Sequence, residues 1–401
     1  MNVLVLNAGS SSVKYQLMCV ETEEVLTKGA CERIGAEDGI FTHGMKPNEV
    51  KEIVAMHDHE NAIARVLDCL VNGDTAVLKS LDEIDAVGHR IVQGGKYFKG
   101  STIVNDDVIA KIDELIELAP LHNGPALQGI YACQKLMPGV PMVTVYDSAY
   151  FYTMPPKAFM YPIPYEYYEK YGIRKYGAHG TSHKYVAKRA AAFLNKDIKD
   201  LKIITCHLGN GCSISAIKDG IAVDTSMGLT PLDGLMMGTR SGAIDPTVVT
   251  FIMDHEGMSA EDANTMLNKK SGLLGVSGVS NDSRDIEEAC AQGNERAQLA
   301  FDMYCDRVKK HIGQYMAVLG GVDVIVLTAG IGENSAVTRK AIFEGLEPLG
   351  MVLDEERNAV RGSERVISSD DSKVTILVIP TNEELAIAQD TYELVSAAKN
   401  A

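Results

Sequence analysis

The stretch VLVLNAGSSSVKYQLMCV, residues 3–20, decides the fold. An apolar run at residues 3–6 is followed by small residues at 8–12 and then by a second strand-like run at 13–20. Short apolar runs separated by glycine and serine are typical of two strands joined by a turn. The opening of the chain therefore predicts a β-hairpin.

The same arrangement returns about one domain later. Residues 201–208 form a second apolar run, Gly209, Asn210 and Gly211 make the turn, and residues 212–217 form the returning strand. Two copies of one device in a single chain indicate an internal repeat. We therefore expect an α/β fold made of two duplicated domains with a cleft between the copies.

Helices alternate with the predicted strands. Asn105 caps a helix that ends at Pro120, Ser182 caps a helix that runs to about residue 194, and Asn382 caps a final helix over residues 383–398. Residues 323–328 and 374–379 are expected to be buried strands. The domain boundary is expected near residues 147–156, where an apolar strand gives way to an aromatic, proline-rich stretch.

Composition excludes several classes of protein. A chain of 401 residues is long for one core, so two domains are expected. The net charge of −16 repels nucleic acids and anionic membranes, so neither is an expected partner. The first residues predict a strand and not a signal peptide, and the eight cysteines form no C-x-x-C pair. These features favour a cytoplasmic protein with reduced thiols.

Two turns have residues suited to binding phosphate. In the first, Asn7 precedes a glycine and the hydroxyls of Ser10 and Ser12, and Lys14 follows. Backbone N–H groups in such a turn can approach an anion closely. This first turn is equally consistent with a serine-rich hairpin turn, and the second turn, HLGNG at residues 207–211, taken alone is better explained as an ordinary hairpin turn. Their joint occurrence favours phosphate binding, although the Walker P-loop and the full Rossmann motif are absent from the sequence.

A third glycine-rich segment, AGIGENS at residues 329–335, follows a buried strand. Bare backbone at this point lets a flat ligand such as adenosine or a sugar approach. An ordinary strand-to-helix turn is the alternative.

Charged side chains near glycines supply candidate catalytic groups. Arg90 and Arg240 can bind carboxylate or phosphate in a bidentate way, and structural salt bridges are the alternative. His179 precedes a helix start, where it can donate to a phosphoryl group. We reject a metal pair with His183 because His179 is expected in the loop before the helix. His122 lies in a loop with no preference between a structural and a functional role.

Two carboxylates complete the candidate set. Asp147 ends a predicted strand, and Glu383 stands at the start of the last helix. Glu383 can be a simple helix cap, or a ligand of Mg²⁺, usually through water.

Together these segments resemble the acetate kinase family. The matching motifs follow one another in the family's order over nearly the whole chain: NAGSSS (7–12), YGAHGTSH (176–183), HLGNG (207–211), MGTR (237–240), TAGIGENS (328–335) and PTNEEL (380–385). The resemblance implies the fold of actin, sugar kinases and heat-shock chaperone ATPases, with two duplicated actin-like, ribonuclease H-like domains and the nucleotide in the cleft between them. It implies domains of residues 1–148 plus 385–401 and of residues 149–384, and a homodimer built mainly through the second domain.

The resemblance further implies reversible, Mg²⁺-dependent, in-line phosphoryl transfer between ATP and acetate, giving ADP and acetyl phosphate, with Mn²⁺ as a substitute metal. Arg90 and Arg240 resemble the residues that grip the reacting groups, His179 the transition-state donor, and Asp147 the carboxylate that orients the arginines. Asn7 and Glu383 resemble the residues that place the metal. The phosphate contacts correspond to Ser10, Ser12, His122 and Asn210. The nucleotide contacts correspond to Lys14, Ser12, His207, Leu208, Gly209, Asn210, Gly211, Asp282, Ser283, Arg284, Gly330, Ile331, Gly332 and Asn334.

The acid pocket departs from the family pattern. Its walls correspond to Val92, Leu121, Ala178 and Pro231, and Ala178 stands where the family usually has phenylalanine. Gln93 replaces a usual histidine, and Phe151 is the residue that could supply the missing ring. A wider pocket would favour propionate or butyrate, so a short-chain acyl kinase is the alternative reading.

Three other classes of protein are alternatives to a carboxylate kinase. A sugar kinase would use Asp147 as a general base beside a sugar hydroxyl. A nucleotide-driven conformational protein usually carries an additional binding domain or a polymer surface, and a non-catalytic binding module does not need the set of arginines, histidine and metal site. Each class fits this sequence less well than a carboxylate kinase does.

Overall fold

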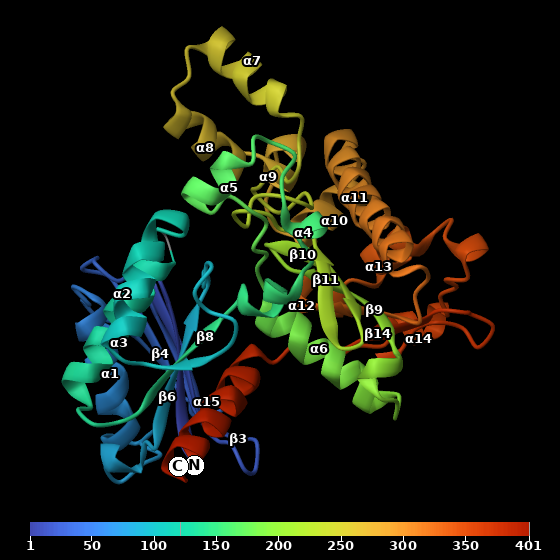
Figure 1. Ribbon diagram of the computed structural model, residues 1–401. Helices are drawn as coiled ribbons and strands as arrows, with labels where there is room; N and C mark the ends of the chain where they lie inside the picture. Colours follow the sequence, from blue (N-terminus) through green and yellow to red (C-terminus); the bar gives the residue numbers. More distant parts are fainter. Residues whose placement is uncertain (121, 401) are drawn as a thin grey trace. The chain divides into compact units, whose positions relative to one another are not determined.

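The computed structural model describes residues 1–120 and 122–400, coloured along the chain in Figure 1. They divide into two units, each of which is described here by itself. Unit 1 consists of Met1–Tyr152 together with the residues from Asn382 onward, and unit 2 consists of Thr153–Thr381.

Unit 1 is built on an eight-stranded sheet. β1 (Asn2–Gly9) pairs antiparallel with β2 (Ser12–Cys19), which confirms the predicted hairpin. On its other side β1 runs parallel to β6 (Ala86–Ile91), and β6 runs parallel to β8 (Met142–Tyr146). The full order is β5-β4-β3-β2-β1-β6-β8-β7. The remaining strands are β3 (Glu24–Glu32), β4 (Ile40–His43), β5 (Val50–Ile53) and β7 (Thr102–Ile103).

Helices cover this sheet. α1 (His59–Val71) and α3 (Asn123–Leu136) contribute buried apolar residues to one core, and Asn105 caps α2 (Asp106–Glu114) as predicted. α15 (Glu383–Lys399) packs on β1, β6 and β8. Gly88 permits this packing, because a Cβ there would lie 2.7 Å from both Ile387 Cγ2 and Thr391 Oγ1.

Unit 2 repeats the arrangement on a six-stranded sheet of order β11-β10-β9-β12-β14-β13. β9 (Lys202–Leu208) pairs antiparallel with β10 (Cys212–Lys218) and runs parallel to β12 (Val324–Thr328), which pairs parallel with β14 (Thr375–Val378). In both units the first strand of a hairpin therefore lies beside a parallel strand, as the predicted internal repeat requires. The other strands are β11 (Ile221–Thr225) and β13 (Arg365–Val366).

Two helices contact opposite faces of β9. Ile204, Cys206 and Leu208 join the apolar core that includes α11 (Glu295–Leu319). The alternate side chains Thr205 and His207 form hydrogen bonds with residues of α6 (Gly180–Phe193). This polar face of β9 therefore supplies the side chains that can take part in a reaction.

Unit 2 contains further helices, and Figure 1 shows α7 and α8 beyond its sheet. They are α4 (Pro156–Phe159), α5 (Glu166–Tyr171), α7 (Pro246–Glu256), α8 (Ala260–Lys269), α9 (Gly272–Ser277), α10 (Ser283–Ala291), α12 (Ala329–Asn334), α13 (Ala336–Phe343) and α14 (Glu355–Ala359). Among the described residues, no helix has the length and apolar character needed to cross a membrane.

The predicted cap of α6 is wrong. The helix begins at Gly180, and its N-cap is His179, which has a left-handed backbone with φ 59°. Ser182 lies inside the first turn because its hydroxyl bonds His207 Nδ1 and Thr381 Oγ1, each at 2.8 Å, instead of capping the backbone. The glycine-rich segment that begins at Ala329 is also part of a helix, because α12 starts at this residue, directly after β12. The cap of α15 is confirmed, since the Asn382 side chain accepts from the Leu385 N–H.

Candidate active site

The parallel strands of unit 1 bring three predicted residues together at their carboxyl ends. Arg90 lies near the end of β6, Asp147 directly follows β8, and Asn7 lies near the end of β1. Arg90 Nη2 donates to Asp147 Oδ2 at 2.6 Å, its Nε donates to Oδ1 at 3.2 Å, and its Nη1 donates to Asn7 Oδ1 at 3.3 Å. Asp147 is only 1% exposed, so this bidentate pair fixes the direction of the guanidinium.

Glu383 adds a further carboxylate at the first residue of α15. Loss of solvent raises the pKa of its carboxyl to about 7, Arg90 opposes that rise, and the negative charges of Asp147 and Glu384 add to it. The same carboxylates, chiefly Asp147, raise the pKa of Arg90 against the opposing effect of burial. This end of the sheet therefore holds more negative charge than one arginine neutralises.

The first predicted phosphate turn is the tip of the β1–β2 hairpin. Ser10 lies in the turn and is exposed, Ser12 begins β2 and is half-buried, and Lys14 is exposed on β2. Each is therefore available to a ligand. His122 is the N-cap of α3 and is half-buried.

The turn after β6 is held by buried amides. Gln93 Oε1 accepts from the Gly95 N–H at 2.9 Å, while Asn123 exchanges hydrogen bonds with the Gln93 backbone. Gln93 is thus held in this turn through its side-chain oxygen and its backbone. Val92 is half-buried beside it, and Leu121 lies outside the described residues.

In unit 2, two predicted donors come together at Gly211. A Cβ built on Gly211 would lie 3.5 Å from Arg240 Nη1, 3.6 Å from His179 Cε1 and 3.7 Å from His179 Nε2. Arg240 Nη1 also donates to the Pro231 carbonyl at 3.2 Å, and burial lowers the pKa of the guanidinium. A small anion beside Gly211 would therefore meet an imidazole edge and a guanidinium together.

The rear edge of His179 faces a polar network. Its Nδ1 lies 2.9 Å from Ser213 Oγ, and the same hydroxyl lies 2.7 Å from His183 Nε2. His183 Nδ1 in turn lies 2.6 Å from Thr205 Oγ1. The rings of His179 and His207 stack with centroids 4.1 Å apart. Burial, and to a smaller degree His207, hold the pKa of His183 well below its ordinary value.

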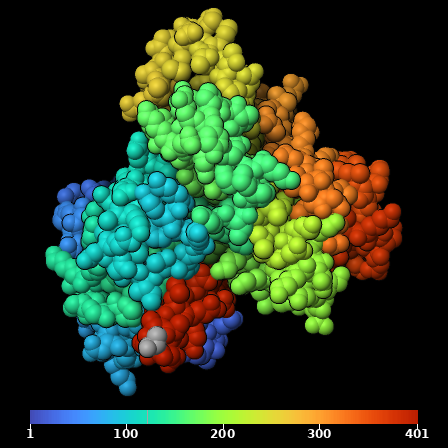
Figure 2. All heavy atoms as spheres, in the orientation of Figure 1, coloured from blue at the N-terminus to red at the C-terminus, as the bar shows by residue number. Residues whose placement is uncertain are grey.

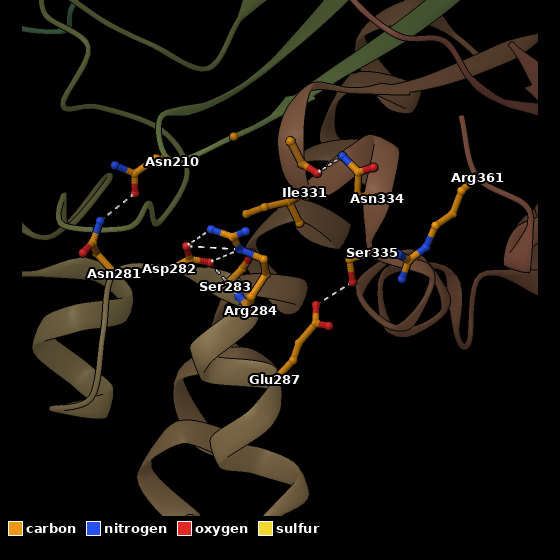
Figure 3. A pocket seen from close by; sticks show the side chains of 12 residues that line it. Asn210, Asn281, Asp282, Ser283, Arg284, Glu287, Ile331, Asn334, Ser335 and Arg361 are labelled. Atoms are coloured by element: carbon orange, nitrogen blue, oxygen red, sulfur yellow. Dashed lines mark hydrogen bonds and ion pairs between the residues drawn. The ribbon is translucent and has the colours of Figure 1, made fainter. Parts of the chain in front are cut away.

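The predicted nucleotide residues of unit 2 largely share one pocket of about 650 Å³, shown in Figure 3. That volume is in the range of small-molecule sites. Eight residues predicted from the sequence line it: Gly209, Asn210, Asp282, Ser283, Arg284, Gly330, Ile331 and Asn334. Among the described residues, His207, Leu208, Gly211 and Gly332 lie outside this lining, and Ser12 and Lys14 belong to unit 1.

Four lining residues were missed: Asn281, Glu287, Ser335 and Arg361. Figure 3 shows Asn281 directed at Asn210, with 3.4 Å between Nδ2 and Oδ1, and Glu287 bonded to Ser335 at 2.5 Å. Asn281 adjoins the predicted Asp282, so extending that segment by one residue would have found it, whereas Ser335 is the last residue of the AGIGENS segment and was not among the predicted contacts. Glu287 and Arg361 lie in no recognisable motif.

The residues predicted to wall the acid pocket belong to both units. Val92 lies in unit 1, whereas Ala178 and Pro231 lie in unit 2. Ala178 is buried at 2% exposure within the apolar core of unit 2. Phe151 is fully buried in unit 1, where its ring lies 5.7 Å from that of Tyr150.

Comparison with known proteins gives a consistent result. A model of the acetokinase family matches residues 2–389. The acetate kinase of Thermoanaerobacterium thermosaccharolyticum is 57% identical over 400 residues, covering 100% of both chains. Among solved structures, the acetate kinase of Porphyromonas gingivalis has a TM-score of 0.95 at 48% identity, covering 98% of this chain and 99% of that one. A propionate kinase from Francisella tularensis has a TM-score of 0.92 at 44% identity, with the same coverage.

Proposed function

Since the chain belongs to the acetokinase family, it is a kinase that transfers a phosphoryl group between ATP and acetate, and we propose that Arg90, Arg240 and His179 align the reacting groups. In this reaction a carboxylate oxygen of acetate attacks the γ-phosphorus. The bond to the bridging β–γ oxygen breaks, and ADP leaves as acetyl phosphate forms. The carboxylate is already ionised, so the chain needs no general base.

One observation carries the proposal. His179 Nε2 and Arg240 Nη1 converge beside Gly211, next to the pocket that contains Gly209 and Asn210. Phosphoryl transfer demands little covalent chemistry, but it does require donors placed where negative charge spreads over the equatorial oxygens. A guanidinium and an imidazole N–H at one point meet that requirement.

Unit 1 supplies a second arginine with a fixed direction. Because Asp147 holds Arg90 through two hydrogen bonds, the guanidinium loses little freedom when it binds an anion. We assign Arg90 to the acid's carboxylate and to phosphoryl oxygens, and Asp147 to the orientation of Arg90. Ser10, Ser12, Lys14 and His122 are proposed phosphate contacts from the same unit.

The nucleotide is assigned to the pocket of unit 2. Bare backbone at Gly330 leaves room for a flat ligand, because a Cβ built there would meet nothing within 4 Å. Asp282, Ser283 and Arg284 at the start of α10 provide polar contacts for the base or the ribose.

We propose Mg²⁺ as the metal, with Asn7 and Glu383 holding it through oxygen, partly by way of water. Among the described residues, no group of three or more histidine, cysteine, aspartate or glutamate side chains forms a metal site by itself. Two oxygen donors with excess negative charge nevertheless fit a hard cation that keeps several waters and shares phosphate oxygens. Bound there, Mg²⁺ or Mn²⁺ would neutralise phosphate charge.

The direct test is acyl phosphate formation, trapped as the hydroxamate, with Mg-ATP and acetate, propionate or butyrate. His179→Ala and Arg240→Ala should each lower kcat by about a hundredfold or more. Ser241→Ala, next to Arg240 in the same segment, is the matched control, because its hydroxyl bonds the Gly242 carbonyl. If both site variants kept full turnover while folded, the assignment of these two residues would fail.

The preferred acid is a separate proposal. Ala178 stands where the family usually has a ring, and one structural relative is named a propionate kinase. We infer that propionate and butyrate are accepted beside acetate. One methylene in an apolar pocket changes transition-state binding by about 1–3 kcal/mol, so the expected result is a preference without exclusivity.

We also propose a homodimer formed through α7. This helix has no buried residue, and it leaves large apolar side chains open to solvent: Val248 is 45% and Phe251 59% exposed. The yellow atoms at the top of Figure 2 include this open surface. A second copy would bury these apolar side chains, so Phe251→Glu should shift the molar mass measured by light scattering from dimer to monomer.

A cytoplasmic location is proposed as well, where the eight free thiols would stay reduced.

A further inference from the structure

A chain of hydrogen bonds leads from the core of unit 2 to the proposed phosphoryl donor. It runs from Thr205 through His183 and Ser213 to Nδ1 of His179, with lengths of 2.6, 2.7 and 2.9 Å. Thr205, His183 and Ser213 are each fully buried. The proposed reaction uses only the other edge of His179, so it leaves this chain without a role.

The chain couples two tautomers. The buried Ser213 hydroxyl has one hydrogen, and among the described residues its hydrogen-bond partners are these two rings alone, so it donates to one histidine and accepts from the other. Of His179 Nδ1 and His183 Nε2, therefore, only one carries a hydrogen. His183 is neutral because it is fully buried, so the hydrogen on one of its nitrogens decides the direction of every bond in the chain.

Thr205 decides between the two directions. Among the residues that the structure describes, His183 Nδ1 is the one hydrogen-bond partner recorded for the Thr205 hydroxyl. If Thr205 accepted this bond, its own buried hydrogen would lack an acceptor, which is destabilising. Thr205 therefore donates to Nδ1, His183 donates from Nε2 to Ser213, and Ser213 donates to His179 Nδ1.

The consequence reaches the reacting groups. A neutral His179 that accepts at Nδ1 carries its hydrogen on Nε2, the nitrogen beside Gly211 and Arg240. Phosphoryl oxygens accept hydrogen bonds, so only this tautomer of the neutral ring can bind them. With the direction reversed, a neutral His179 would turn a bare lone pair toward the phosphoryl group.

We propose that Thr205, His183 and Ser213 are positioning residues that hold His179 in the tautomer with its hydrogen on Nε2. This inference rests on the proposed role of His179 in phosphoryl transfer. It adds three residues, none of which contacts the reacting groups, to the machinery of the reaction.

The primary test is spectroscopic and does not depend on activity. Nitrogen NMR of the full chain labelled with ¹⁵N-histidine distinguishes a protonated ring nitrogen from a bare one, and the His179→Gln variant identifies the His179 signals. The expected wild-type result is a protonated Nε2 on both His179 and His183. A hydrogen on Nδ1 of His179 in the neutral ring would overturn the proposal.

Kinetics supply the second test. Ser213→Ala should lower kcat about tenfold to a hundredfold, with the KM values for ATP and acetate within about twofold, because the ring stays but its donor is no longer held. Ser213→Thr should restore most of the loss. Thr205→Val removes the first donor without touching His179 and should give a smaller loss of kcat together with a mixture of His179 tautomers.

Ser215→Ala is the matched control. Ser215 lies two residues further along β10, is also fully buried, and bonds Thr225 Oγ1 instead of a histidine. It should change neither kcat nor the His179 signals. If Ser213→Ala and Ser215→Ala had equal effects, the chain would be merely structural and the proposal would fail. If His179→Ala stayed active, the proposed role of His179 would fail, while the wild-type spectrum would still decide the tautomer.

Discussion

Replacing Gly211 by alanine places a methyl group where the transferring phosphoryl group is proposed to lie. The new carbon would be 3.5 Å from Arg240 Nη1 and 3.7 Å from His179 Nε2, which are ordinary van der Waals distances. The φ of Gly211 also lies outside the left-handed region, so alanine can adopt its backbone conformation. The folded protein therefore accepts the methyl group, and we expect the free energy of unfolding to change by less than about 0.5 kcal/mol.

The same methyl group should be costly for catalysis. An oxygen bonded to both donors lies about 2.9 Å from each nitrogen, on the side that the methyl carbon would occupy. At least one of the two hydrogen bonds is then lost. Removal of one transition-state donor typically costs about 10²–10³ in kcat, or about 2.7–4 kcal/mol.

The assay is hydroxamate trapping under saturating Mg-ATP and acetate, with thermal unfolding measured on the same samples. Gly313→Ala is the control, since Gly313 lies within α11 and a Cβ there would meet nothing within 4 Å. A folded Gly211→Ala variant with wild-type kcat would refute the placement of the phosphoryl group beside Gly211.

Three further predictions follow from the site. Asp147→Asn keeps the volume but removes the charge paired with Arg90; urea unfolding should show a loss of about 3 kcal/mol, and steady-state kinetics a raised KM for acetate. Ala178→Phe should lower the propionate-to-acetate ratio of kcat/KM roughly tenfold. An unchanged ratio would show that Ala178 does not determine which acid is preferred. The pKa of Glu383 is about 7 in the folded protein against an ordinary 4.5, so the folded state binds more protons between these values and stability falls as pH rises through that window. Glu383→Gln should remove the part of this decrease that comes from Glu383. The free energy of unfolding, measured with urea at pH 5 and at pH 8 without metal, checks this, and a pH dependence equal to that of the wild type would contradict the prediction.

The two hairpins could be predicted because a short, continuous stretch of sequence determines each of them. The apolar runs of β1 and β9 end at glycine-containing turns, and no distant residue is needed to recognise that pattern. The start of α6 could not be predicted in this way. Serine is a favoured N-cap, but Ser182 uses its hydroxyl on His207 and Thr381, and both partners are remote in sequence.

The candidate site shows the same division. Asn210 and Gly330 stand in glycine-rich segments that are visible in the sequence, and the structure places them in one pocket. Ser213 and Thr205 look like ordinary strand residues, because their importance comes only from the side chains opposite them. Arg361 enters the pocket from the segment after α14, and only tertiary structure could assign it there.

The return of α15 to unit 1 has a consequence for the order in which the protein is made. A ribosome completes all of unit 2 before it adds the helix that packs on β1, β6 and β8. The earliest-made sheet therefore waits with the Gly88 face uncovered until residues 383–399 emerge. Damage to the end of the chain should accordingly expose the beginning of it, and a nascent chain stalled at residue 381 should offer that bare sheet face to chaperones.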